Sequence, residues 1–256
     1  MQEATIHNQT IVEQFSQQAA PFAAVPGHMD SMQMLIDLSR VSLAEDVLDV
    51  ACGPGLVACA FAPHARHVTG IDITPRMIEL AKQRQEEQQL RNLSWKIGDV
   101  LPLPFPSSCF HLVLTRFTFH HFLNPQAVLA EMVRVCKPGG KVMIVDVVQS
   151  PEKVLAYDRL EKLRDPSHVH ALTFSEMHDL IAVSGLLNIR TARYKMEGEV
   201  ERHLAASFPN PEDVERIRIL FQSDLQLDRL GMDVHLQGDE IHFAFPILAT
   251  VGEKPA

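Results

Sequence analysis

A glycine-rich turn, followed at a set distance by an aspartate, is the part of this sequence with the clearest chemistry. Asp49 lies near the end of a short apolar run, and Gly53 and Gly55 form the turn after it. Glycine has no Cβ, so the backbone of such a turn can approach a ligand, and the first N–H groups of the next helix point to the same place. Asp72 ends a second apolar run 19 residues after Gly53, where a carboxylate typically accepts hydrogen bonds from ribose hydroxyls. The spacing predicts a site for a cofactor that contains a nucleoside.

The turn by itself is compatible with more than one class of cofactor. The pattern Gly53-x-Gly55-x-x-Ala58 satisfies the dinucleotide fingerprint, so a nicotinamide-dependent oxidoreductase is one alternative. Such an enzyme also needs hydride-transfer groups, such as a Tyr-x-x-x-Lys pair. The residues four places after the two tyrosines of the chain are Glu161 and Gly198, so neither tyrosine makes this pair.

Further motifs follow the glycine turn in a characteristic order. Gly98-Asp99-Val100 comes after a third apolar run, and a fourth run ending in Arg116 and the stretch Cys136–Asp146 come next. In this order the chain resembles the class I S-adenosylmethionine-dependent methyltransferases, including the ubiquinone and menaquinone biosynthesis C-methyltransferases. The resemblance implies transfer of a methyl group from S-adenosylmethionine to a small molecule. A protein of this fold that binds the cofactor but does not transfer methyl stays open as a second alternative.

The resemblance covers roughly residues 10–190. It departs from the usual Asp/Glu-x-Gly-x-Gly-x-Gly loop at Ala51, which stands where the first glycine is expected. Alanine is a small residue, so the departure affects only the tightness of the turn.

The cofactor contacts implied by the resemblance lie at the ends of the apolar runs. Gly53 and Gly55 are expected against the methionine and ribose part of S-adenosylmethionine, with Asp49 near its amino group. Asp72 is expected to hold the ribose diol, and Arg116 to face the methionine moiety. The adenine contacts are assigned to four further residues, with Ile73 and Met77 flanking the ring, Asp99 accepting from its amine and Val100 offering backbone.

Three of these residues also fit roles that involve no ligand. Met77 suits the core side of a helix, Asp99 is a common type of turn residue after a strand, and Arg116 can be solvated. The cofactor prediction therefore depends mainly on the spacing of 19 residues between Gly53 of the glycine turn and Asp72.

Histidines supply the candidates for proton transfer to or from the methyl acceptor. Methyl transfer from a sulfonium is an in-line displacement, and it needs a base only where the acceptor keeps its proton near neutral pH. His120 and His121 follow the fourth apolar run, and the segment Arg164-Asp165-Pro-Ser-His168 resembles one that recurs in this methyltransferase group. His121 and His168 are the catalytic candidates, although structural roles fit equally well in a chain with 13 histidines.

Alternating strand and helix patterns are expected to bring these residues together. Such alternation predicts an α/β fold with a parallel sheet, helices on both faces and a ligand site at the carboxyl ends of the strands. The resemblance implies a doubly wound, mostly parallel seven-stranded sheet whose last strand is antiparallel and lies beside the sixth. The strands are predicted at 46–50, 67–71, 93–97, 110–115, 141–148, 186–194 and 240–251. The helices are predicted at 5–20, 30–38, 55–62, 75–89, 125–136, 176–184 and 211–227.

The chain divides into four predicted parts. Residues 1–40 form an N-terminal helical cap, whose first helix is expected to be interrupted at Pro21, Pro26 and Gly27. Residues 41–195 form the cofactor-binding core, and 239–256 hold the last strand that completes it. The part between them, 196–238, is expected to be an insertion that caps the substrate.

Composition narrows the function further. A net charge of −9 argues against a nucleic-acid partner, because such proteins usually present a basic face. The four cysteines show neither Cys-x-x-Cys nor zinc spacing, so no metal site is predicted and reduced, buried thiols are expected. The absence of a signal-peptide pattern and of an apolar run long enough to span a membrane predicts a cytoplasmic enzyme. The expected partner is a small-molecule methyl acceptor, and a homodimer stays open.

Overall fold

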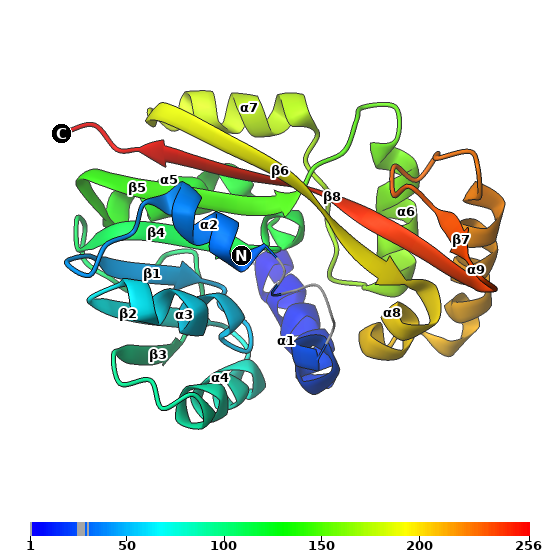
Figure 1. Cartoon of the computed structure of the whole chain (residues 1–256), viewed down its shortest axis with the longest axis horizontal. Helices are drawn as coiled ribbons and strands as arrows, with labels where there is room; N and C mark the ends of the chain where they lie inside the picture. The colour runs from blue at the N-terminus through cyan, green and yellow to red at the C-terminus, as the bar shows by residue number, and fades with distance from the viewer. Residues whose placement is uncertain (1, 25–28, 30) are drawn as a thin grey trace.

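One mixed sheet organises the whole chain. The structure is a computed structural model that describes residues 2–24, 29 and 31–256. Its strands are β1 (Asp46–Val50), β2 (His67–Asp72), β3 (Leu93–Ile97), β4 (Phe110–Arg116), β5 (Cys136–Val147), β6 (Leu187–Glu199), β7 (His235–Gln237) and β8 (Glu240–Glu253). They are ordered β3-β2-β1-β4-β5-β8-β6, and β7 pairs with β8 outside this path (Figure 1).

The predicted fold class is confirmed. Strands β1 to β5 pair in parallel, and β8 is antiparallel to both of its neighbours, β5 and β6. The short strand β7 was not predicted. It pairs with the start of β8 across a turn at Gly238, whose φ of +66° is easily adopted by glycine.

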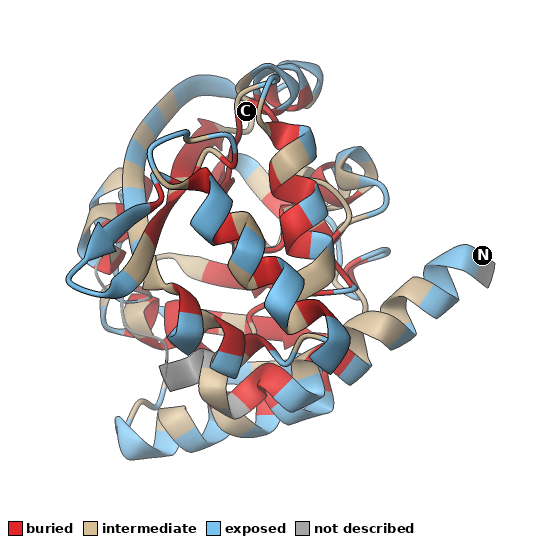
Figure 2. Ribbon diagram, turned by 90° about the vertical axis from the view of Figure 1, so that its right-hand side faces the viewer, coloured by how far each residue is buried: buried red, intermediate tan, exposed pale blue. Residues whose placement is uncertain are grey.

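Helices cover both faces of the sheet because successive strand residues point to opposite sides. Val47 belongs to the apolar core on one face, and its neighbour Leu48 belongs to the core on the other. Figure 2 shows the buried residues gathered along the strands and on the inner sides of the helices. The first face is covered by α2 (Met32–Ser39) and α3 (Leu56–Phe61), and the second by α5 (Pro125–Val135) and α7 (Phe174–Val183).

A group of helices lies at the far ends of the long strands β6 and β8, and we call it the cap. It consists of α6 (Val154–Arg164), α8 (Val200–Ser207) and α9 (Pro211–Asp224). The N-terminal helix α1 (Gln2–Ala24) lies between the cap and the core, where it contacts α8 on one side and α4 (Pro75–Glu87) on the other (Figure 1). None of the helices in the described ranges is long and apolar enough to cross a membrane.

One local prediction about the helices was wrong. Pro21 does not interrupt α1, which continues to Ala24. Tertiary contacts support this last part of α1, because Gln14 and Gln18 both donate to the main-chain oxygen of Ser207, at 2.8 and 2.9 Å. Helix α6 was not predicted, because buried polar residues such as Asp158 and Glu161 interrupt its apolar pattern. Pro26 and Gly27, also expected to break the first helix, lie outside the described residues.

Candidate functional site

A cavity of about 270 Å³ lies at the carboxyl ends of strands β1 to β4, with α1 along one side. On the core side, its polar side chains lie at the ends of these strands or in the turns that follow them, as expected for a ligand site in a parallel sheet. Of the residues predicted from the sequence, those that line this first cavity are Gly53, Asp72, Ile73, Met77, Asp99, Val100, Arg116 and His121.

Asp72 is held rigidly at the end of β2. One carboxylate oxygen accepts from the N–H of Gly53 and the other from the N–H of Thr74, both at 2.8 Å. Burial raises the pKa of Asp72, although these backbone hydrogen bonds oppose the shift. Each carboxylate oxygen can accept a further hydrogen bond, so Asp72 is able to bind a pair of hydroxyl groups.

The two glycines of the turn have different surroundings. Gly53 has φ of +50°, and a Cβ built on it meets nothing within 4 Å. Gly55 has φ of +76°, and its Cβ would lie 2.8 Å from the Trp95 ring and 2.9 Å from the Cβ of Ala81. Gly53 therefore opens the backbone toward the cavity, which it lines, whereas Gly55 allows helix α4 and β3 to pack against the turn.

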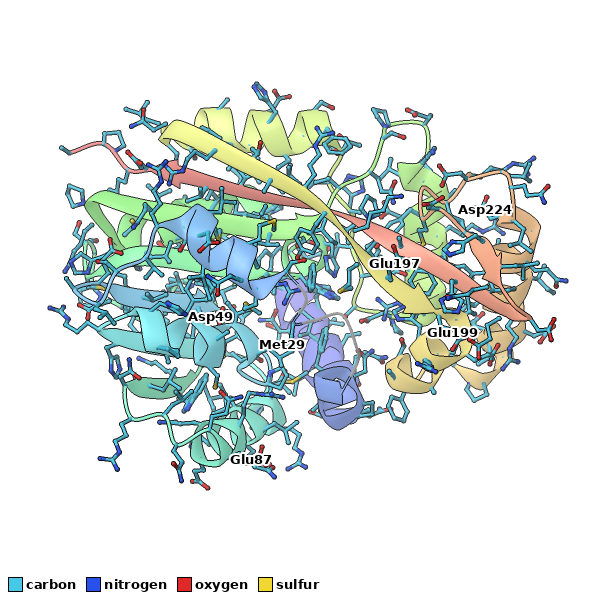
Figure 3. The ribbon with its side chains drawn as sticks, in the orientation of Figure 1. Met29, Asp49, Glu87, Glu197, Glu199 and Asp224 are labelled. Carbon is cyan, nitrogen blue, oxygen red and sulfur yellow. The ribbon has the colours of Figure 1, made fainter. Side chains whose placement is uncertain are left out.

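Asp49 lies near the end of β1, where Figure 3 labels it. It is buried and does not line the first cavity. Its Oδ2 atom has no hydrogen-bond partner among the described residues. Burial raises the pKa of this carboxyl group to about 8, and the nearby charge of Asp72 adds to the shift. An unpartnered buried carboxyl oxygen is costly, so this position suits a cationic or hydrogen-donating ligand group.

Helix α1 is tied to the rim of the first cavity by two side chains. Asn8 donates to Oδ2 of Asp99 at 2.7 Å, and the Nε2 atom of His7 contacts the main-chain oxygen of His121 at 2.7 Å. These contacts connect α1 to the turns after β3 and β4. The helix therefore encloses the cavity on the side away from the sheet.

A second cavity, of about 560 Å³, lies between the core and the cap. Phe15, Phe117 and His121 line both cavities and so form the boundary between them. Phe117 has φ of +58°, an unusual backbone conformation for a bulky residue, and the Arg116 guanidinium lies 4.3 Å from the centre of its ring. The ring of Phe15 meets His121 edge-on, with 5.1 Å between ring centres.

Comparison with known proteins identifies the family. A family model described as a methyltransferase domain matches residues 48–144. The chain is 30% identical over 159 residues to the uncharacterized methyltransferase YcgJ of Bacillus subtilis, covering 61% of this chain and 63% of that protein. It is also 30% identical over 164 residues to the uncharacterized protein YafE of Escherichia coli, covering 63% of this chain and 79% of YafE. The segment 48–144 belongs to the methyltransferase domain family.

Two further likenesses show how far this relationship extends. The crystal structure of YcgJ superposes with a TM-score of 0.82 at 24% identity, covering 90% of this chain and 100% of the other, so the two share a fold. The demethylmenaquinone methyltransferase of Tropheryma whipplei is 36% identical over 122 residues, or 47% of this chain and 49% of that enzyme. The matched region thus spans just under two thirds of the YcgJ sequence and about half of the demethylmenaquinone enzyme.

The two histidines predicted as catalytic have different positions. His121 lies at the boundary of the cavities, and its Nδ1 is 3.0 Å from the main-chain oxygen of Ser167. Burial lowers the pKa of His121 well below its usual value, and neighbouring histidines add to the shift. His168 lines neither cavity, its side chain is 0% exposed, and its Nε2 atom contacts Asp158 at 2.7 Å.

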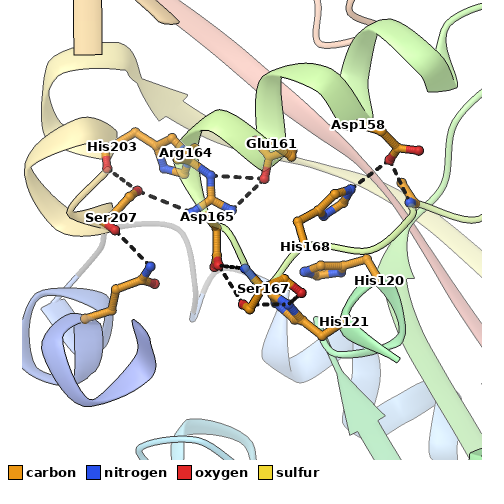
Figure 4. A network of polar contacts seen from close by, with 12 residues as sticks. His120, His121, Asp158, Glu161, Arg164, Asp165, Ser167, His168, His203 and Ser207 are labelled. Atoms are coloured by element: carbon orange, nitrogen blue, oxygen red, sulfur yellow. Dashed lines mark hydrogen bonds and ion pairs between the residues drawn. The ribbon is translucent and has the colours of Figure 1, made fainter. Parts of the chain in front are cut away.

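Sequence reasoning gave no role to two charged pairs beside the second cavity, and Figure 4 shows one of them, Glu161 with Arg164. His120 contacts Asp146 at 2.6 Å, and Glu161 contacts Arg164 through one carboxylate oxygen. Burial alone would raise the pKa of Glu161, but the charge and hydrogen bonds of Arg164 outweigh it and lower the pKa to about 2. Asp146 was visible as a carboxylate near the end of a strand, whereas nothing in the sequence pointed to Glu161.

Proposed function

We propose that this protein transfers a methyl group from S-adenosylmethionine to a small organic molecule by in-line displacement. The cofactor binds in the first cavity and the acceptor in the second. The observation that carries the proposal is the shared boundary of Phe15, Phe117 and His121, because in-line transfer needs donor and acceptor on the two sides of one narrow contact. The match of residues 48–144 to a methyltransferase domain and the likeness to YcgJ support the same activity.

The residues around the first cavity fit S-adenosylmethionine. The unpartnered Oδ2 of Asp49 suits the cationic amino group, and Asp72 suits the ribose diol. Gly53 leaves room for the ligand beside the turn. The cofactor supplies an electrophilic methyl group on its sulfonium. We assign the adenine ring and the methionine carboxylate to the other predicted residues, namely Ile73, Met77, Asp99 and Val100 for the former and Arg116 for the latter.

The second cavity fits a moderately apolar acceptor with an aromatic or quinone-like ring. Aromatic side chains from α1, the turn after β4, α6 and β8 line it, and an acceptor ring can stack edge-on or offset against them. The relative that methylates demethylmenaquinone supports the same class of acceptor. The lining aromatic residues are Phe15, Phe117, Tyr157, Phe243 and Phe245.

We assign different roles to the two predicted histidines. His121 forms part of the wall between donor and acceptor, and its lowered pKa keeps it neutral beside a cationic cofactor. His168 acts as a positioning residue, because Asp158 connects it to α6 and it faces neither cavity.

Binding and transfer can be tested separately. Calorimetric titration with S-adenosylmethionine, S-adenosylhomocysteine, NAD and NADP is expected to give micromolar binding of the first two only. Transfer of labelled methyl from S-adenosylmethionine to ring compounds then tests the activity. Binding of the nicotinamide nucleotides alone would overturn the proposal, and cofactor binding without transfer to any small molecule would leave a non-transferring member of the family.

A further inference from the structure

His120 lines the second cavity with a carboxylate directly behind it. Its Nδ1 atom is 2.6 Å from Oδ1 of Asp146, near the end of β5, and the side chain of His120 is only 13% exposed. Asp146 is itself fixed, because its oxygens accept from the N–H groups of Thr118, Phe119 and Val147 at 3.0, 2.6 and 2.7 Å. A carboxylate held in this way sets both the orientation and the tautomer of the imidazole.

This arrangement leaves the other ring nitrogen of His120 available. With the Nδ1 proton donated to Asp146, Nε2 carries a lone pair. In the described part of the chain no hydrogen bond to this Nε2 atom is found, and it is not among the fully buried polar atoms that have no partner. A lone pair in this position can accept a proton from a molecule bound in the second cavity.

The neighbouring histidines do not have the same combination of features. His121 has a serine and a main-chain oxygen next to Nδ1 instead of a carboxylate. His168 uses Nε2 to contact Asp158 and does not reach the cavity. His170 contacts Asp158 and Glu176 but lines neither cavity.

We infer that His120, oriented by Asp146, is the base that removes a hydroxyl proton from the acceptor in the second cavity. The inference rests on the proposed function and deepens it, because it restricts the acceptor to compounds whose nucleophile keeps a proton near neutral pH. Phenol-type hydroxyl compounds meet this condition, whereas tertiary amines and thioethers have no proton to lose.

The atoms and electrons of the step balance as follows. Nε2 of His120 takes the hydroxyl proton, and an electron pair of the acceptor oxygen forms the bond to the methyl carbon. The bond between that carbon and the sulfonium breaks, and its electron pair stays on sulfur to give S-adenosylhomocysteine. The protonated imidazole then loses its proton to solvent, which restores the base.

The charges around His120 fix the direction of the pH dependence. Asp146 on β5, Glu161 and Arg164 on α6, and the adjacent rings of His121 and His168 all face it. Burial lowers the pKa of His120, but the charge and hydrogen bond of Asp146 outweigh burial, so the pKa lies above the usual 6.5. The neutral form is the base, and kcat is therefore expected to rise with pH through a limb above 6.5.

Nitrogen-15 NMR of the histidine rings tests the pair without any acceptor. In the wild-type protein the pKa of His120 is expected above 6.5, and in Asp146→Asn it should fall. His170→Gln serves as the matched control, and the pKa of His120 is compared between the two variants. His170 also has carboxylate partners and a raised pKa, but it lies outside both cavities. A His120 pKa that does not respond to Asp146→Asn would overturn the inference, whatever the cofactor measurements give.

Steady-state kinetics with S-adenosylmethionine tests the acceptor class. Phenols and naphthols form one set of acceptors, and tertiary amines and thioethers form the other. Turnover is expected only with the first set, and His120→Gln should lower kcat by roughly 10²- to 10⁴-fold while His170→Gln leaves it unchanged. The cofactor affinity of His120→Gln should stay within about twofold of wild type, which also checks folding.

Three kinetic results would overturn the inference. They are turnover of the second set alone, equal kcat in the two histidine variants, and no turnover of any hydroxyl compound by protein that binds the cofactor. Failure of the wild-type protein to bind S-adenosylmethionine would instead overturn the proposed function.

Discussion

The two cavities share a boundary but differ in how their charges are balanced. In the first cavity and directly behind it, burial raises the pKa values of Asp72 and Asp49, and no basic side chain forms an ion pair with either among the described residues. Beside the second, basic partners lower the pKa values of Glu161 and Asp146 despite burial. The first cavity is therefore suited to a ligand that brings positive charge, whereas Glu161 and Asp146 beside the second already have basic partners.

The two cavities also differ in where their residues come from. The core side of the first cavity is formed by short turns after four strands, within residues 51–128. The second combines residues from α1, the turn after β4, α6, β6, α8 and β8, which lie far apart in the sequence (Figure 1). Changes in one cavity should therefore leave ligand binding in the other largely intact, and the following predictions test this separation.

The largest effect is expected for Glu161→Gln beside the second cavity. The change leaves Arg164 charged and nearly buried without its ionised partner, which typically costs about 3 to 5 kcal/mol of unfolding free energy. Urea unfolding measures this loss, and calorimetry should show S-adenosylmethionine affinity within about twofold of wild type. Glu79→Gln removes a similar i,i+3 pair, Arg76–Glu79, from an exposed surface and should have almost no effect. Equal losses in the two variants would contradict the prediction.

Asp72→Ala in the first cavity should instead weaken binding of the cofactor and leave the second cavity unaffected. Hydrogen bonds from a ligand to a charged group contribute about 1.5 to 3 kcal/mol each, so loss of the ribose contacts should weaken S-adenosylmethionine binding roughly 100-fold. Affinity for the acceptor should change little. Titration calorimetry measures both, and the exposed Asp179→Ala serves as the control. Unchanged cofactor affinity in Asp72→Ala would remove the ribose assignment.

The two cavities draw their residues from different parts of the sequence, and this difference explains which cavity the sequence was able to predict. Each turn of the first cavity follows an apolar run, so Asp72, Asp99 and Arg116 were recognisable one at a time from local patterns. Strand ends in a parallel sheet meet at one edge, and this geometry turned separate local signals into one site.

The second cavity had no comparable local signal. Its boundary uses Phe15 and Phe117, which become neighbours only when α1 folds across the end of β4. Glu161 lies on a helix whose buried polar residues conceal its apolar pattern. The pairing of His120 with Asp146 depends on how the turn after β4 folds back over β5, and spacing alone cannot give that contact.

Asp49 allows a test of the buried carboxyl group that lies behind the first cavity without a basic partner. Its pKa of about 8, against 3.8 as the ordinary value, means that the folded protein holds a proton that the unfolded chain has released between these pH values. Wild-type stability therefore falls as pH rises through this window, by up to roughly 1.4 kcal/mol per pH unit. Asp49→Asn lacks this loss and should become progressively more stable than wild type from about pH 4 to pH 8.

Urea unfolding at a series of pH values measures the effect of Asp49→Asn, and calorimetry should show weaker binding of S-adenosylmethionine by the more stable variant. Glu79→Gln again serves as the control, because an exposed carboxylate should give no such trend. A stability difference that does not vary with pH would mean that Asp49 is ionised in the folded protein.

The smallest effect separates packing from ligand contact within a single turn. Both Gly53 and Gly55 have positive φ, so alanine strains the backbone at either position by roughly 1 to 2 kcal/mol. At Gly55 the new Cβ also collides with Trp95 and Ala81, and Gly55→Ala should therefore lose about 1 kcal/mol more stability than Gly53→Ala. Gly53→Ala should instead cause the larger loss of cofactor affinity, because its Cβ enters the first cavity. Thermal unfolding and calorimetry of the two variants measure these effects, and the same ranking in both experiments would mean that one glycine serves both packing and binding.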